Sequence, residues 1–118
     1  MAAKKTHCSC LDTLNPVRES LDVISGKWKL LIIISVSGGN ERFTDIQASI
    51  PGITPKVLAK ELKELEQNKL VKRIVTDEYP VKIAYKPAPY AKTLAPIIYA
   101  LKDWGMTHSK KVWAREDM

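Results

Sequence analysis

The spacing of apolar residues predicts a first helix that begins near residue 15. Val17, Leu21 and Ile24 stand four and three positions apart, which places them on one face of a helix. Asn15-Pro16 comes directly before them. It supplies a capping side chain followed by proline, whose fixed φ suits the first helical turn. The predicted helix therefore starts at Asn15.

The chain as a whole is expected to consist of a tail and one domain. Residues 1–14 are polar and show no apolar period, so we expect a flexible N-terminal tail there. A length of 118 residues suits a single domain around one core, and we assign residues 15–118 to that domain.

A second segment, residues 27–39 with the sequence KWKLLIIISVSGG, is apolar on all sides. Such a segment is expected to be buried, but its pattern does not distinguish a helix from a strand. Its length favours a helix, whereas its three isoleucines favour a strand. We predict a central helix that ends at Gly38-Gly39, because glycine accepts the left-handed conformation that closes many helices.

The longest helical pattern up to this point begins at Thr54-Pro55, where a capping residue and a first-turn proline again stand together. A Pro51-Gly52 turn separates it from a short apolar helix before it. Asn68 is expected to close the long helix in the left-handed conformation. Leucines at helical spacing form its predicted buried stripe. They are Leu58, Leu62 and Leu65.

Two β-type segments and a last helix complete the chain. Residues 70–75 and 82–87 are rich in β-branched and aromatic side chains, and the short segment between them contains Pro80, so they are predicted to form a hairpin. The last helix is amphipathic. Its apolar residues are Leu94, Ile97, Ile98, Leu101 and Trp104.

This order of elements predicts an α+β fold that is mostly α. Two helices joined by a tight turn, with a hairpin directly after the second, make a winged helix-turn-helix with a two-stranded β-wing. The last helix is then available for dimerisation. Such a fold presents one helix to the major groove of DNA and the β-loop to the flanking backbone or the minor groove.

The charge balance fits a phosphate-rich partner. Lysine and arginine total 19 against 13 acidic residues, a formal net charge of +6, which suits nucleic acid or an anionic membrane surface. No apolar run approaches the length that crosses a bilayer, so we expect no membrane association. The first residues lack the apolar segment of a signal peptide, and we expect a cytoplasmic protein.

The helix that begins at Thr54 has a cationic side opposite its leucines. When Leu58 is the reference, the other two leucines lie within about 40° of it in helical projection. The opposite side carries Lys56, Lys60, Lys63 and Gln67. A solvated face with ion pairs to Glu61, Glu64 and Glu66 is the alternative. The basic segment Lys72-Arg73 directly downstream favours DNA binding.

Several longer stretches of the chain resemble the HxlR-type transcription regulators, which are related to the MarR group. They are NPVRESLDVISGKWKLLII, RFTDIQASIPGITPKVLAKELKELEQNKLVKR, YPVKIAYKPAPYAKTL and ALKDWG. The resemblance extends over about residues 15–105 without gaps. It implies a helical second segment and a homodimer, formed by the first and last helices, that binds a near-palindromic operator. It leaves the operator, the sign of regulation and any effector open.

The chain departs from the family pattern at the start of the first helix. The family commonly has Cys-Pro-Val there and uses the cysteine to sense oxidants or electrophiles, whereas this chain has Asn15-Pro16-Val17. Thiol sensing at position 15 is therefore excluded. Cys8 and Cys10 are weak redox candidates, because a mobile tail does little to lower a thiol pKa.

Other classes of function have less support. The two histidines, His7 and His108, have no nucleophile and orienting acid at recognisable spacing, so we expect no enzyme, and no cofactor is indicated. The segment HCSC lacks a second cluster to complete a metal site, so we expect no metal. A winged helix that binds a protein within a larger assembly, in place of DNA, is the main alternative.

The expected partners are therefore double-stranded DNA and a second copy of the chain. The candidate DNA-binding residues are Thr54, Lys56, Lys60, Lys63, Lys72, Arg73 and Lys82. The candidate dimer-interface residues are Val17, Leu21, Leu94, Ile97, Ile98, Leu101 and Trp104.

Overall fold

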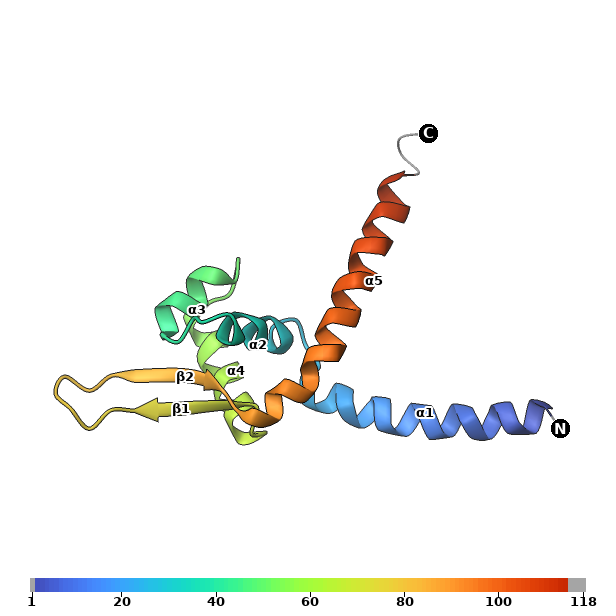
Figure 1. Ribbon diagram of the computed structural model, residues 1–118, viewed down its shortest axis with the longest axis horizontal. Coiled ribbons are helices and arrows are strands. Elements are labelled where there is room, and N and C mark those ends of the chain that lie inside the picture. The colour runs from blue at the N-terminus through green and yellow to red at the C-terminus, as the bar shows by residue number, and fades with distance from the viewer. Residues whose placement is uncertain (1, 115–118) are drawn as a thin grey trace.

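The computed structural model confirms a mostly helical winged helix-turn-helix with a two-stranded antiparallel wing (Figure 1). It describes residues 2–114, and the side chains of residue 10 and of residues 12–112. The elements in chain order are α1 (Ala2–Ile24), α2 (Lys29–Ser37), α3 (Phe43–Ser49), α4 (Pro55–Gln67), β1 (Val71–Val75), β2 (Ile83–Pro87), the 3₁₀ helix η1 (Pro89–Leu94) and α5 (Ala95–Ala114). None of the described helices is both long and apolar enough to cross a membrane.

The core lies where α2, α3, α4 and the base of the hairpin meet. Its fully buried side chains come from all three helices and from the residues that lead into β1. They include Ile32, Ile33, Val36, Ile46, Leu58, Leu62, Leu65 and Leu70. The predicted leucine stripe of α4 is confirmed, and it fixes which side of α4 faces solvent.

The first helix begins earlier than predicted. α1 is continuous from Ala2, so the predicted start at Asn15 is wrong and Pro16 lies inside the helix. An interior proline removes one backbone hydrogen bond. Alanine and lysine, which are strong helix formers, occupy residues 2–5 at the start of α1. Residues 2–14, predicted as a flexible tail, are thus helical in the structure, while their flexibility stays a prediction.

The second segment is a helix, as predicted, and Gly39 after its C-terminus adopts a positive φ of 109°. Its predicted burial on all sides is wrong. Leu31 and Ile34 are 42% and 46% exposed, whereas Ile32 and Ile33 are buried. An apolar sequence shows that a helix avoids water, but it does not show whether its own chain covers every side.

Helix α4 has the predicted start and a different end. The Thr54 side-chain oxygen accepts a hydrogen bond from the Val57 backbone N–H at 3.3 Å, which caps the helix. Asn68, predicted to be left-handed, has φ −87°. The left-handed residue is Lys69, with φ 64°, and the Leu70 N–H then donates to the carbonyl oxygen of Leu65. The Asn68 side chain donates to the carbonyl oxygen of Glu64 instead.

Replacing Thr54 by alanine is expected to lower the free energy of unfolding by about 0.5–2 kcal/mol, because the first turn of α4 loses its cap. Chemical denaturation followed by circular dichroism measures this difference. The matched control is Thr54→Ser, which keeps the capping oxygen. If both variants were equally stable, the cap would contribute nothing.

The hairpin has a defined register. Val71 pairs with Pro87 and Val75 with Ile83, close to the predicted strands. The Thr76 N–H donates to the carbonyl oxygen of Lys82, which extends the ladder past the ends of the strands. On the other side of β2, the Tyr85 N–H donates to the carbonyl oxygen of Glu41 and ties the wing to the α2–α3 connection.

The molecule is elongated because two helices project from the core. Its radius of gyration is 18.4 Å, whereas a compact chain of this length would have about 13–14 Å. In Figure 1, α1 and α5 extend on the side opposite the tip of the hairpin and diverge from each other. Within α1, Val23 near the C-terminus packs against the core.

Candidate nucleic-acid interface

The turn between α3 and α4 sets the direction in which α4 leaves the core. Ile50 and Ile53 on either side of the turn are buried. Between them Gly52 has φ 85°, a conformation that costs glycine little and other residues more. Thr54 follows in extended conformation and caps α4. The two buried isoleucines and the glycine thus form the tight connection of a helix-turn-helix.

The solvent side of α4 is cationic at its centre. The three buried leucines hold the opposite side against the core. The exposed residues on the solvent side are Lys56, Lys60, Lys63 and Gln67, which we call the lysine row. None of the ion pairs found among the described side chains involves the lysine row. Its ammonium groups are therefore available to an external anion.

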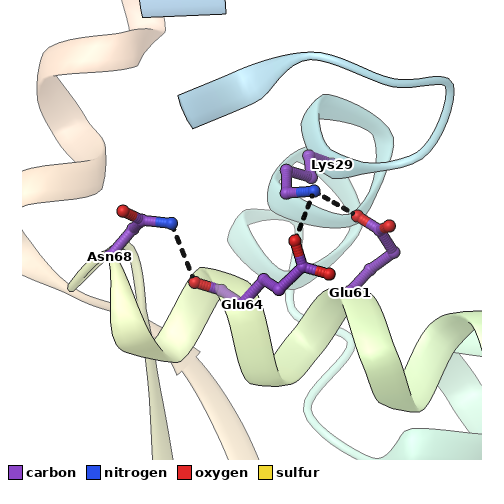
Figure 2. Close-up of polar contacts among 4 residues, drawn as sticks. All are labelled: Lys29, Glu61, Glu64 and Asn68. Atoms are coloured by element: carbon purple, nitrogen blue, oxygen red, sulfur yellow. Dashed lines mark hydrogen bonds and ion pairs between the residues drawn. The ribbon is translucent and has the colours of Figure 1, made fainter. Parts of the chain in front are cut away.

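Two of the three carboxylates of α4 contact a lysine of α2. The Lys29 ammonium lies 2.7 Å from a carboxylate oxygen of Glu61 and 3.3 Å from one of Glu64. Figure 2 shows both carboxylates turned toward Lys29 at the start of α2. The alternative considered above, in which these acids pair with lysines of their own helix, is thus not observed for Glu61 and Glu64. Glu66 is exposed.

The environment of Lys29 stabilises its charged form. The residue is buried, with a side chain 10% exposed. The hydrogen bond to Glu61 is the largest influence and raises the pKa of Lys29 above its usual value. Burial acts in the opposite direction and the hydrogen bond to Glu64 adds to the increase. Lys29 therefore stays protonated at neutral pH.

The predicted wing residues do not share one surface. Lys72 and Arg73 are neighbours in β1, so their side chains point to opposite faces of the hairpin. Lys72 pairs directly with Lys86 of β2. Two like charges opposite each other are unfavourable unless an anion lies near them. The sequence prediction missed Lys86. The predicted strands 70–75 and 82–87 place Tyr85 opposite Lys72, and the observed register is shifted from that pairing by one residue.

The tip of the wing differs from its strands. Lys82 lies directly before β2, where its N–H donates to the Thr76 hydroxyl at 3.0 Å. The loop between them carries exposed Asp77 and Glu78. The cationic part of the wing is thus its strands, while the acidic tip is unsuited to phosphate.

The candidate dimer residues are largely uncovered in the single chain. Val17 and Leu21 of α1 are exposed, and so are Ile97, Leu101 and Trp104 of α5, the last of them 66%. The other two candidates, Leu94 and Ile98, are half-buried and pack against the core.

The two cysteines belong to α1, not to α4 or the wing. Cys10 is exposed and has a free thiol. Cys8 lies outside the residues whose side chains the structure describes. In the part of the chain with described side chains, no three His, Cys, Asp or Glu residues lie close enough to hold a metal ion.

Comparisons with known proteins agree with this architecture. The family model described as HxlR-like helix-turn-helix matches residues 23–112. The HTH-type transcriptional regulators YdeP and YtcD of Bacillus subtilis are 34% and 35% identical over 97 residues. The matched residues cover 82% of this chain in both comparisons. They cover 76% of YdeP and 77% of YtcD.

Solved structures give the same result. The redox regulator HypR in its reduced form has a TM-score of 0.77 and 34% sequence identity, over 85% of this chain and 99% of its own. The reduced form of the transcriptional regulator YodB from B. subtilis has a TM-score of 0.68 and 34% identity. It covers 76% of this chain and 88% of its own.

Proposed function

This chain belongs to the HxlR-like helix-turn-helix family and is a DNA-binding transcriptional regulator, and we propose that it acts as a homodimer on a near-palindromic operator. The lysine row supports this proposal most strongly. It is exposed, free of ion pairs among the described side chains, and held on a helix whose other side is fully buried.

Within this proposal, the basic residues divide between affinity and sequence recognition. Lys60 and Lys63 on α4, with the basic residues of the wing, neutralise phosphates and give affinity without sequence information. The wing residues are Lys72, Arg73 and Lys82, to which the register adds Lys86. Because Lys72 and Arg73 point to opposite faces, we expect only one of them to contact the same DNA surface as α4.

The start of α4 is the part that reads bases. Lys56 in the first turn is exposed and can donate to the O6 and N7 atoms of guanine. Thr54 is exposed as well. Its oxygen already accepts the Val57 N–H, but its hydroxyl proton can still be donated to a base or a phosphate.

The homodimer follows from the uncovered apolar residues of α1 and α5. An isolated helix in water gains little stability from its own sequence and depends on packing of its apolar side. In the single chain, both helices carry apolar residues that are exposed to solvent. They are Val17 and Leu21 on α1 and Leu101 and Trp104 on α5. A twofold axis between two copies would place the α4 helices about 34 Å apart, one turn of DNA.

A gel-shift experiment on DNA upstream of the gene for this protein, with a salt titration, tests the proposal. A specific complex of two chains per site is expected, with an affinity that falls steeply as salt rises. A winged helix that binds only a protein partner would give no specific complex. That outcome would favour the alternative function.

Replacing Lys60 by alanine is expected to weaken binding to all DNA sequences and to lower the salt slope by about one for each subunit bound. The reason is the loss of one phosphate contact and of the counterions that it releases. Fluorescence anisotropy at several salt concentrations measures the slope. Lys111→Ala, near the end of α5, is the matched control. An unchanged slope would remove Lys60 from the interface.

A further inference from the structure

The acidic residues of α4 stand close to the lysine row on both sides. In helical projection Glu64 lies about 40° from Lys60, and Glu66 lies about 60° from Lys63 on the other side. Glu61 lies on the same side of the helix as Glu64, but farther from the lysine row. With three lysines and three glutamates, α4 carries no net side-chain charge. Its solvent side is cationic only if the carboxylates are directed elsewhere.

Lys29 directs two of these carboxylates toward the protein. It belongs to α2, thirty-two residues before Glu61 in the chain, and its ammonium contacts Glu61 and Glu64 at 2.7 and 3.3 Å. The Glu61 side chain is 14% exposed, so this carboxylate is largely removed from solvent. Figure 2 shows the two acids converging on Lys29 from successive turns of α4.

Without Lys29, the same carboxylates would have other contacts within reach. Glu64 stands four residues after Lys60, a spacing at which opposite charges pair on a helix. A Lys60 ammonium paired with Glu64 would release fewer counterions from DNA. Unpaired carboxylates beside the lysine row would also repel phosphates.

We infer that Lys29 is a positioning residue for DNA binding, which holds Glu61 and Glu64 against α2 so that the lysine row meets DNA without them. This inference rests on the proposed role of α4 as the DNA-contacting helix. It gives Lys29 a function beyond joining two helices. The residue determines the charge that α4 presents to solvent, although it makes no DNA contact itself.

Lys29→Met tests this role on a duplex of mixed sequence of about 30 base pairs, long enough for one dimer. Relative to the wild type, we expect about tenfold weaker binding at about 0.1 M salt and a salt slope reduced by about one per subunit. Lys111→Met removes the same charge near the end of α5 and is expected to change affinity less than about twofold. Equal effects of the two variants would overturn the inference.

The variant Lys29→Met/Glu61→Gln/Glu64→Gln separates this role from a purely structural one. It lacks the ion pairs, but it also lacks the carboxylates that Lys29 holds. The inference predicts that affinity and salt slope return to within about twofold of the wild type. If the ion pairs served only to hold α4 in place, the triple variant would bind as weakly as Lys29→Met, and the inference would be wrong.

A second comparison applies even if Lys29→Met does not fold. Glu64→Gln and Glu66→Gln make the same chemical change on opposite sides of the lysine row. Glu66 is exposed and has no ion pair among the described side chains, so its removal is expected to tighten DNA binding about threefold. Glu64 is paired with Lys29, although its side chain is 37% exposed, so its removal is expected to tighten binding less. Equal gains would contradict the inference. If the wild type did not bind the duplex at all, the proposed function itself would fail.

Discussion

Leu62→Ala is expected to lower the free energy of unfolding by about 2–5 kcal/mol, a large part of the stability of a small domain. Leu62 is 1% exposed and lies between Leu58 and Leu65 in the stripe that holds α4 to the core. Truncation removes buried methyl groups and leaves a cavity that the surrounding isoleucines fill only in part. Because the same leucines orient the lysine row, DNA affinity is expected to fall with stability.

Chemical denaturation at one fixed protein concentration measures this loss, because the stability of a dimer depends on concentration. Val81→Ala in the wing loop is the matched control. Val81 is exposed, so its truncation is expected to change the free energy of unfolding by less than about 0.5 kcal/mol. A Leu62→Ala protein as stable as this control would mean that α4 is not anchored by its leucine stripe.

The elements that were predicted well have their determinants close together in sequence. Helix α4 begins where a capping threonine and a proline stand side by side, and its buried side follows from leucines three and four residues apart. The hairpin follows from two β-type segments around a proline-containing loop. Local chemistry of this kind acts within a few residues, so it can be recognised without the rest of the fold.

Some of the missed features are ambiguous local patterns, and the others depend on contacts distant in sequence. The start of α1 was misjudged because Asn15-Pro16 has the pattern of a helix start, although the helix continues through it. The end of α4 was misjudged by one residue, from Asn68 to Lys69. The contact between Lys29 and Glu61 has no signature in a single sequence, because either charge could pair with many others. The same limit applies to the exposed side of α2.

The largest functional effect is expected from a charge placed on the exposed side of α5. Leu101→Asp puts a carboxylate among Ile97 and Trp104, which are exposed in the single chain and are proposed to pack against a second copy. A buried, unpaired carboxylate opposes association strongly. We therefore expect a monomer whose affinity for a two-half-site operator falls by at least about a hundredfold, because the second half-site no longer binds as part of one molecule.

Analytical ultracentrifugation and a gel shift on the same preparations measure the two parts of this effect. Lys110→Asp is the matched control, because residue 110 lies on the opposite side of α5, about 180° from Leu101 in helical projection. It changes the charge by more than Leu101→Asp does, yet it is expected to leave a dimer. A dimeric Leu101→Asp protein would exclude this side of α5 from the interface. A monomer that still bound the operator at wild-type affinity would show that one copy of the chain is sufficient for DNA binding.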